Sequence, residues 1–297
     1  MTQRCGFVAL VGAPNAGKST LLNRLLGVKL SIVTPKAQTT RRRVLGILIH
    51  GEAQIVLVDT PGIFEPRRKL DRAMVGAAWS GASEADRIVL LVDAERGADS
   101  DTRRILDGLK EQNLRALLAI NKIDLVPPPA LLPIAEHLDR TGIFDDILMI
   151  SSLTGDGVDD LKKRLAADLP EGPWLYPADQ LTDLPERLLA AEITRERLFL
   201  ELRQELPYAS AVETDRWQEQ PDGSVRIDQT IHVERDSQKP IVLGKGGRQI
   251  KRIGELARLE MERFFARRIH LFLFVRVTEG WAEKREHFTA MGLDYES

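Results

Sequence analysis

Residues 12–19 of this sequence combine residue types that bind a chain of phosphates. They read GAPNAGKS, which matches the spacing of a phosphate-binding loop at every required position. In such a loop the backbone amides point at the anion, the lysine reaches the terminal phosphates, and the serine hydroxyl binds Mg²⁺. A plain glycine turn between a strand and a helix is the structural alternative. The expected nucleotide contacts are Gly12, Ala13, Pro14, Asn15, Ala16, Gly17, Lys18, Ser19 and Thr20.

A second segment, DTPG, supplies a carboxylate for the same metal ion. Asp59 follows an apolar run, where the second metal-associated carboxylate of such a site is expected, and the Gly62 amide should face the terminal phosphate. Alone, this segment is also an ordinary turn. A threonine in the polar stretch 35–41 can close over the metal when the third phosphate is present, and we favour Thr40 over Thr39. These segments predict nucleotide contacts at Asp59, Thr60, Pro61, Gly62 and Ile63, metal ligands Ser19, Thr40 and Asp59, and catalytic roles for Lys18, Thr40 and Gly62.

A third segment, NKID, carries groups that distinguish guanine from adenine. The Asp124 carboxylate can accept hydrogen bonds from both N–H groups on one edge of guanine, and adenine offers no such pair. We expect Lys122 to lie along the base plane and Asn121 to tie the loops together. Ser151 and Ser152 follow another apolar run and fit the last loop that contacts the base. A surface turn with two charges is the alternative, which the position after an apolar run disfavours.

The order of apolar and helical segments predicts a mainly parallel α/β sheet with helices on both faces up to about Leu169. Ligands of such folds bind at the carboxyl ends of strands, where all three segments stand. The expected strands are 7–11, 44–49, 55–58, 88–92, 117–120 and 147–150, and the expected helices include 19–26, 101–112, 131–141 and 158–168.

The second half of the chain has a different pattern, which predicts a smaller α+β domain. The proline-rich stretch 170–177 indicates a stiff linker. We therefore expect a nucleotide-binding domain at 1–170, a linker at 171–184 and a second domain at 185–297. The second domain should contain a helix at about 185–205, strand-like segments at 211–218 and 225–234, the apolar residues 241–243, a glycine loop, a helix near 249–266 and a strand at 269–277.

The glycine loop GKGG lies in the most basic part of the chain. Residues 239–278 hold ten Lys and Arg against three Glu, a charge balance that indicates a polyanion contact. A solvated basic face is the alternative. We expect Ile250 to lie in the core, and we do not expect Phe272 and Phe274 to stack on bases. The expected RNA contacts are Gly244, Lys245, Gly246, Gly247, Arg248, Lys251 and Arg252.

Length and composition limit the class of protein. The 297 residues have room for about two domains, and the single cysteine, Cys5, permits no intramolecular disulfide. This favours a cytoplasmic protein. No apolar run approaches the roughly 20 residues that span a bilayer, while a peripheral contact with the cytoplasmic face of the cell membrane stays open.

With these motifs, the first domain resembles those of the Era and tRNA-modification group of GTPases, and the whole chain is similar to the Era-like members. The likeness rests on the residues AQTTR after the first helix, DTPGI and the GKGG loop. The resemblance implies a monomeric bacterial GTPase with Mg²⁺ and a C-terminal type II KH domain. It also implies binding of single-stranded sequence near the 3′ end of the small-subunit ribosomal RNA, and help in assembling the small ribosomal subunit.

Two further expectations concern hydrolysis. Ras-like switches place a glutamine after the DTPG-type glycine to orient the attacking water, whereas this chain has Ile63, so we expect slow intrinsic hydrolysis of GTP to GDP. In related GTPases a K⁺ ion, held partly by the asparagine at the position of Asn15, supplies the missing charge.

A metabolic phosphotransferase and an RNA-binding module with a vestigial GTPase are the alternative functions. The base reader disfavours the first and the intact nucleotide motifs disfavour the second.

Overall fold

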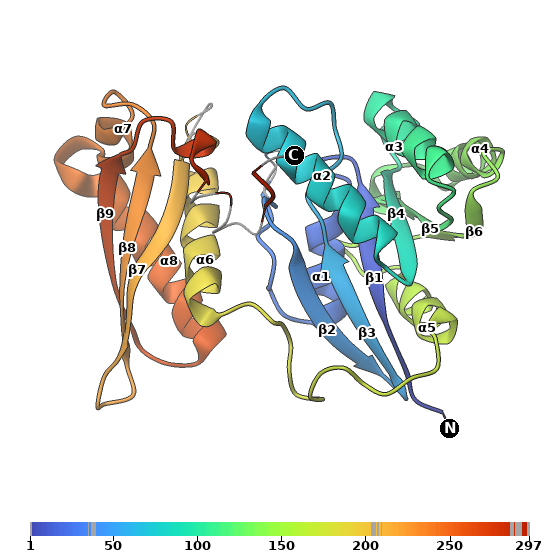
Figure 1. The fold of residues 1–297 in the computed structure, drawn as a ribbon, viewed down its shortest axis with the longest axis horizontal. Coiled ribbons are helices and arrows are strands. Elements are labelled where there is room, and N and C mark those ends of the chain that lie inside the picture. Colours follow the sequence, from blue (N-terminus) through green and yellow to red (C-terminus); the bar gives the residue numbers. More distant parts are fainter. Residues whose placement is uncertain are drawn as a thin grey trace. The chain divides into compact units, whose positions relative to one another are not determined.

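The computed structural model describes residues 2–34, 36, 40–202, 206, 208, 210–285, 288 and 293–295. The chain forms two compact units (Figure 1). The first comprises residues 1–31, 37–183 and 289–297, and the second comprises residues 32–36 and 184–288. None of the described helices combines the length and the apolar character needed to cross a membrane.

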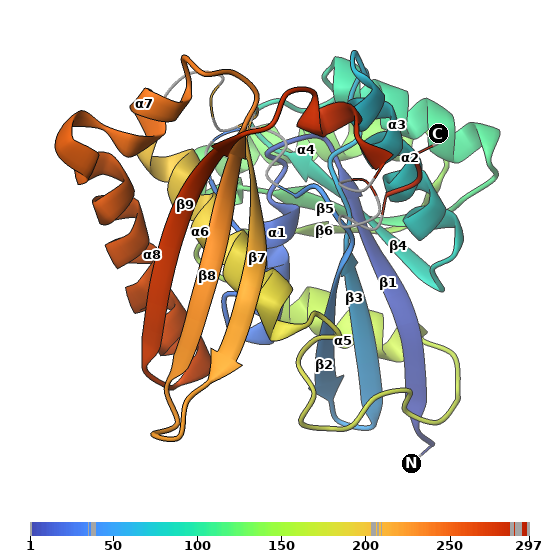
Figure 2. The same cartoon turned by 60° about the vertical axis from the view of Figure 1, so that its left-hand side comes forward.

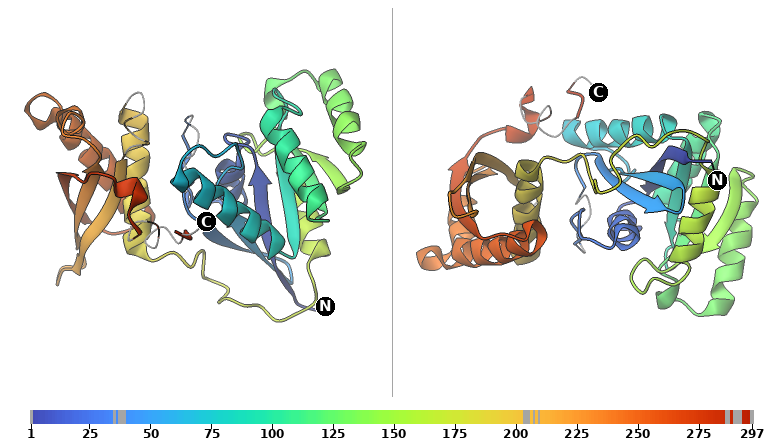
Figure 3. Two further views of the ribbon diagram at one scale, coloured as in Figure 1. Left: turned by 45° about the horizontal axis from the view of Figure 1, so that its top comes forward. Right: turned by 90° about the horizontal axis from the view of Figure 1, so that it is seen from below.

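The first unit is built on a six-stranded sheet in the order β2-β3-β1-β4-β5-β6. Only the β2–β3 pair is antiparallel among the five pairs, which confirms the predicted, mainly parallel α/β architecture. Helices cover both faces of the sheet (Figure 3). The strands are β1 Arg4–Gly12, β2 Val44–His50, β3 Ala53–Asp59, β4 Arg87–Asp93, β5 Ala116–Asn121 and β6 Phe144–Met149, and the helices are α1 Lys18–Leu26, α2 Lys69–Ser83, α3 Ser100–Glu111, α4 Pro128–Asp139 and α5 Val158–Asp168.

The strand sequences explain this architecture. Strands β3 and β5 are buried along their whole length, and such continuous apolar runs are typical of parallel strands covered by helices on both faces. The ends of β1, β3, β4 and β5 are Gly12, Asp59, Asp93 and Asn121. Because these strands are parallel, their carboxyl ends share one edge of the sheet, and that edge carries the polar residues.

Residues 174–182 pack along β2 and β3 within the first unit. The indole Nε1 of Trp174 donates to the Glu52 carbonyl (3.1 Å), and the Gln54 side chain accepts from the backbone amides of residues 175 and 176. The Thr182 hydroxyl donates to the Leu45 carbonyl (2.7 Å). This part of the predicted linker is therefore held by specific hydrogen bonds.

The second unit is a three-stranded sheet, β7-β8-β9, with α6 and α8 packed on one face (Figure 2). Strand β8 pairs antiparallel with β7 and parallel with β9. Helix α6 ends at Glu201, and the extended backbone of Leu202 stops it before the predicted end at residue 205. The elements are α6 Glu186–Glu201, β7 Ser210–Glu219, β8 Val225–Val233, α7 Lys239–Leu243, α8 Arg248–Phe265 and β9 Ile269–Val277.

Residues 32–36 belong to this second unit and lie against α6. The buried carboxylate of Glu196 accepts from the Val33 amide (2.9 Å). The Lys36 ammonium donates to the Leu202 carbonyl (2.5 Å) and to the Phe199 carbonyl. A cation at this position satisfies the free carbonyls at the carboxyl end of α6 and opposes the negative end of the helix dipole.

Candidate functional site

The phosphate loop connects β1 to α1 through backbone conformations that favour glycine. Gly17 has φ +102°, and a Cβ atom there would lie 2.2 Å from the Asn121 side-chain nitrogen. Asn15 also has a positive φ of 65°. These conformations let the chain turn from the end of the strand into the helix, so that the positive amino end of α1 faces the loop.

Lys18 is folded into the loop. Its Nζ donates to the carbonyl oxygens of Gly12 (3.0 Å) and Ala13 (3.1 Å), and the side chain is only 6% exposed. Burial lowers the pKa of the Lys18 ammonium to about 8, against the opposing effect of the Asp59 charge. Burial also raises the pKa of the Asp59 carboxyl, while the Lys18 charge and hydrogen bonds oppose this shift. An anion beside Lys18 would favour its charged form.

Three oxygen-bearing side chains from different segments converge next to Lys18. The Ser19 hydroxyl donates to Asp59 Oδ2 (2.7 Å) and lies 2.9 Å from the Thr40 hydroxyl, which is 3.4 Å from Asp59 Oδ2. The other carboxylate oxygen, Asp59 Oδ1, is buried without a hydrogen-bond partner among the described residues. Mg²⁺ prefers such hard oxygen ligands, so the donor set fits this ion. Thr39 lies outside the described residues.

The segment after Asp59 lies directly over the phosphate loop. A Cβ atom at Gly62 would be 3.0 Å from the Pro14 nitrogen, and the Ile63 amide donates to the Gly12 carbonyl (3.2 Å). The Thr60 hydroxyl donates to the Leu10 carbonyl (2.8 Å), and Pro61 is buried. The Ile63 side chain is fully buried in the core of the unit. A polar side chain at this position would therefore be buried, which makes Ile63 unsuitable for a simple glutamine replacement.

Asn121 joins the three loops of the predicted base reader. Its side-chain nitrogen donates to the Ala16 carbonyl (2.7 Å), and its oxygen accepts from the Ser152 amide and hydroxyl (2.9 Å each). The Ser151 hydroxyl donates to Asp124 Oδ1 (2.5 Å) and orients this exposed carboxylate. The expected role of Asn121 in tying the loops together is thus confirmed.

The sequence analysis missed Asp93, which orients Lys122. The Lys122 ammonium forms an ion pair with Asp93 Oδ2 at 2.6 Å, and its backbone has a positive φ of 65°. The sequence held a signal for this contact, because Asp93 ends an apolar strand that lies next to the strand ending at Asn121.

The glycine loop of the second unit precedes α8 and contains three positive φ angles. They are 69° at Gly244, 62° at Gly246 and 75° at Gly247. A Cβ atom at Gly244 would lie 2.6 Å from the Gln249 Cβ, so the loop is closely packed there. The loop is followed by the predicted basic residues. Lys245, Arg248 and Lys251 are exposed, and Arg252 pairs with Glu201 of α6 at 2.7 Å.

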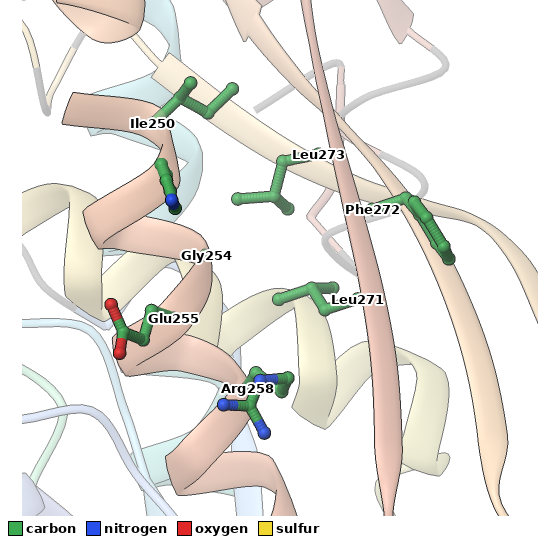
Figure 4. Close-up of a pocket in the computed structure, with 8 residues that line it drawn as sticks. Ile250, Gly254, Glu255, Arg258, Leu271, Phe272 and Leu273 are labelled. Carbon is green, nitrogen blue, oxygen red and sulfur yellow. The ribbon is translucent and has the colours of Figure 1, made fainter. Parts of the chain in front are cut away.

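A groove of about 600 Å³ lies between α8 and the edge strand β9 (Figure 4). The absence of a side chain at Gly254 leaves room in its wall, where a Cβ would be 3.3 Å from the Leu273 side chain. Ile250, predicted as core, packs against the core and also lines this groove. The groove itself was not predicted from the sequence. Its walls are formed by Ile250, Lys251, Gly254, Glu255, Arg258, Leu271, Phe272 and Leu273.

This geometry defines a P-loop GTPase domain followed by a KH domain. A family model for 50S ribosome-binding GTPases matches residues 7–122, and a KH domain model matches residues 205–282. GTPase Era of Rhizobium meliloti is 59% identical over 98% of this chain and 93% of the relative, and GTPase Era of Caulobacter vibrioides is 53% identical over 99% of this chain and 97% of the relative. The chain therefore belongs to the GTPase Era family.

Two solved structures share both units. A point variant of Aquifex aeolicus Era bound to GDP and AlF4⁻ is 41% identical, with a TM-score of 0.93 over 98% of this chain and 99% of the relative. A structure of Era with MgGDPNP and nucleotides 1506–1542 of 16S ribosomal RNA has the same identity, TM-score and coverage. These likenesses agree with the predicted fold class and with GTPase activity.

Asn121→Ala should weaken GDP binding, because it removes the contacts that hold the phosphate loop and the base loops together. We expect a loss of about 1 to 3 kcal/mol, roughly 5- to 150-fold in Kd. Titration with a fluorescent GDP analogue measures this change. Gln112→Ala, which removes an exposed amide outside the site, is the control. An unchanged Kd for Asn121→Ala would contradict the assigned role.

Proposed function

We propose that this chain is a guanine-nucleotide switch that binds RNA near the 3′ end of the small-subunit ribosomal RNA and assists assembly of the small ribosomal subunit. The observation that carries the proposal is the presence, in one chain, of a nucleotide site with a guanine reader and a glycine loop beside a groove. The complex of a relative with MgGDPNP and 16S ribosomal RNA, which matches this chain over both units, supports it.

In the nucleotide site, Lys18 and the loop amides bind the phosphates, and the Gly62 amide faces the terminal phosphate. Ser19, Thr40 and Asp59 would hold Mg²⁺, which neutralises developing charge on the phosphates when bound. The MgGDPNP of the relative supports this ion. Asp59 Oδ1, which is buried without a hydrogen-bond partner among the described residues, is a further oxygen that could bind the ion. Thr40 can report the third phosphate because, among the described residues, its hydroxyl is hydrogen-bonded only to Ser19 and Asp59.

In the base site, Asp124 accepts from the two N–H groups of guanine while Ser151 fixes its orientation. Lys122, held by Asp93, lies along the base. Asn121 and Ser152 connect this site to the phosphate loop. A charged acceptor aimed at two donors rejects a base that lacks them, because the carboxylate would then lose its hydrogen bonds.

In the second unit, the groove beside the glycine loop binds single-stranded RNA. KH domains clamp about four nucleotides against such a loop. Gly244, Gly246 and Gly247 let the RNA backbone approach, and Lys245, Arg248 and Lys251 provide exposed charge. Arg252 contributes charge while its guanidinium is positioned by Glu201. The apolar walls formed by Ile250 and the leucines of β9 suit nucleobases.

The remaining properties belong to the same proposal. The nucleotide domain is 1–170, the linker 171–184 and the KH domain 185–297. The protein acts as a monomer. Its location is the cytoplasm, which the free, buried thiol of Cys5 supports. A native mass measurement tests the monomer.

Asp124→Asn should change the base preference. Its amide can donate to xanthine, which has an acceptor where guanine has an amino group, and it accepts only one hydrogen bond from guanine. We expect GTP affinity to fall by about 2 to 4 kcal/mol, roughly 30- to 1000-fold, with XTP then preferred. Competition of GTP and XTP against a labelled nucleotide measures this. Asp145→Asn, exposed and outside the site, is the control, and unchanged GTP affinity in Asp124→Asn would overturn the base assignment.

GTP hydrolysis should be slow and faster in K⁺ than in Na⁺. The buried Ile63 offers the attacking water no polar side chain, so a monovalent cation near Asn15 would supply positive charge at the phosphates. Phosphate release, measured at equal ionic strength in KCl and NaCl, tests this expectation. Asn15→Ala should remove the difference between the salts. Equal rates in both salts with the unchanged chain would eliminate K⁺ from the mechanism.

RNA binding should depend on the groove and on the nucleotide. Gly254→Leu places a side chain in the groove and should weaken binding of a single-stranded RNA copy of the 16S 3′ end by at least about tenfold, or 1.4 kcal/mol. Leu259→Ala, exposed on the same helix and outside the groove lining, is the control. Anisotropy titrations with a GTP analogue, GDP or no nucleotide at two salt concentrations should show tightest binding with the analogue. If the RNA affinity is the same in all three nucleotide states and falls steeply with salt, the second unit provides only a non-specific basic patch.

A further inference from the structure

The sheet of the second unit has a helix-covered face and an opposite face. Strand residues alternate between the two faces. Ile231 and Val233 of β8 and Leu273 and Val275 of β9 pack with α6 and α8 in one cluster. The alternate residues of β9 therefore lie on the opposite face. We call this set the β9 face, and it consists of His270, Phe272, Phe274 and Arg276.

The β9 face exposes two aromatic rings. Phe272 is 45% exposed and Phe274 is 56% exposed. In Figure 4 the Phe272 ring lies on the other side of β9 from Leu271 and Leu273. The two rings lie two residues apart on one strand, which separates them by about 6.6 Å along it. Neither side chain belongs to the cluster that the sheet forms with α6 and α8, so the packing of that cluster does not account for them.

Each ring borders its own hollow, and each hollow also contains at least one cationic side chain. Phe272 lines a hollow of about 610 Å³ together with Arg226 and His270. Phe274 lines one of about 530 Å³ together with Lys239 and Arg276. The Arg226 guanidinium lies 4.7 Å from the centre of the Phe272 ring. A flat aromatic or guanidinium surface beside a positive charge is the combination that stacks a base and binds its phosphate.

The β9 face is continuous with the groove. Phe272 lines both the groove and the first hollow, and β9 is the edge strand that separates them. A strand of RNA that leaves the groove over this edge would reach Phe272, and Phe274 lies two residues further along the same strand.

We propose that RNA extending beyond the groove crosses β9 and stacks its bases on Phe272 and Phe274, with Arg276 and Lys239 binding the phosphates. This second RNA subsite rests on the proposed RNA-binding function. It reverses the expectation from the sequence that these phenylalanines do not contact bases.

The charge carried by β9 itself favours RNA over a protein partner. The β9 face itself carries His270 and Arg276 and no acidic residue. The carboxylates that line the hollows come from other segments: Asp222 in the first hollow, and Asp215 and Asp236 in the second. Asp228 pairs with Arg226 at 3.0 Å, which holds the guanidinium near the Phe272 ring. Asp215 accepts from the Thr230 hydroxyl at 2.6 Å. Asp222 and Asp236 lie in the loops at the two ends of the strands, beyond the rings.

The test compares a short and a long RNA with the full chain and a GTP analogue. The short RNA has about four nucleotides, the length a KH groove clamps, and the long RNA has about twelve, with both copied from the 16S 3′ end. Phe274→Ala should weaken binding of the long RNA about 5- to 150-fold and leave the short RNA unchanged. Phe274→Trp should restore affinity. Leu200→Ala, which shortens an exposed apolar side chain on α6, is the control.

Arg276→Gln provides a second measurement. It should lower the slope of log affinity against log salt for the long RNA by about 0.7, the value for one phosphate contact on a single strand. It should not change the slope for the short RNA.

The outcomes separate this inference from the function on which it rests. If the unchanged chain binds neither RNA, the proposed function and the inference both fail. If the unchanged chain binds both RNAs and the Phe274→Ala variant binds them with the same affinities, the inference alone fails. Equal losses for both RNAs would mean that Phe274 acts on the groove, which also overturns the second subsite. If Phe274→Ala binds both RNAs normally but binds the small ribosomal subunit weakly, the face contacts protein instead.

Discussion

The nucleotide site depends on the burial of two opposite charges at one edge of the sheet. Burial disfavours the charged forms of both Lys18 and Asp59, and this lowers the pKa of the lysine and raises the pKa of the aspartate. Their mutual attraction offsets only part of this cost. A phosphate beside Lys18 and a cation beside Asp59 would stabilise both charged forms. The site is therefore suited to a ligand that brings both charges, such as a magnesium nucleotide.

The same sheet edge explains why the three motifs form one site. Gly12, Asp59 and Asn121 end parallel strands, so their loops meet although they are far apart in the sequence. Asn121 then converts this proximity into a fixed arrangement, because one side chain bonds the phosphate loop and the last base loop together. Gly17 lies against the Asn121 amide so closely that a Cβ atom would not fit. The phosphate loop and the last of the predicted base loops are thus linked through one residue.

The sequence predicts what depends on local pattern and misses what depends on neighbours in space. The strand-to-loop motifs, the mainly parallel sheet and strand β9 follow from apolar runs, glycines and alternation, and β9 has the predicted bounds. The ion pair of Lys122 with Asp93 forms at the ends of two neighbouring strands, so it depends on the order of the strands in the sheet. The burial of Ile63 depends on the core that packs around it. The groove requires α8 and β9 to lie side by side, which no single segment encodes.

The sequence of strand β9 does not reveal which of its two faces is exposed. Its leucines and phenylalanines make both faces apolar, which is typical of a strand covered on both sides. The helices cover only one face, so the other rings face solvent. Exposed phenylalanines contribute little burial on folding, and they invite association at an edge strand. Two exposed phenylalanines beside cationic groups and next to a groove are therefore better explained by binding than by folding. Binding of planar, anionic molecules accounts for both the rings and the charges.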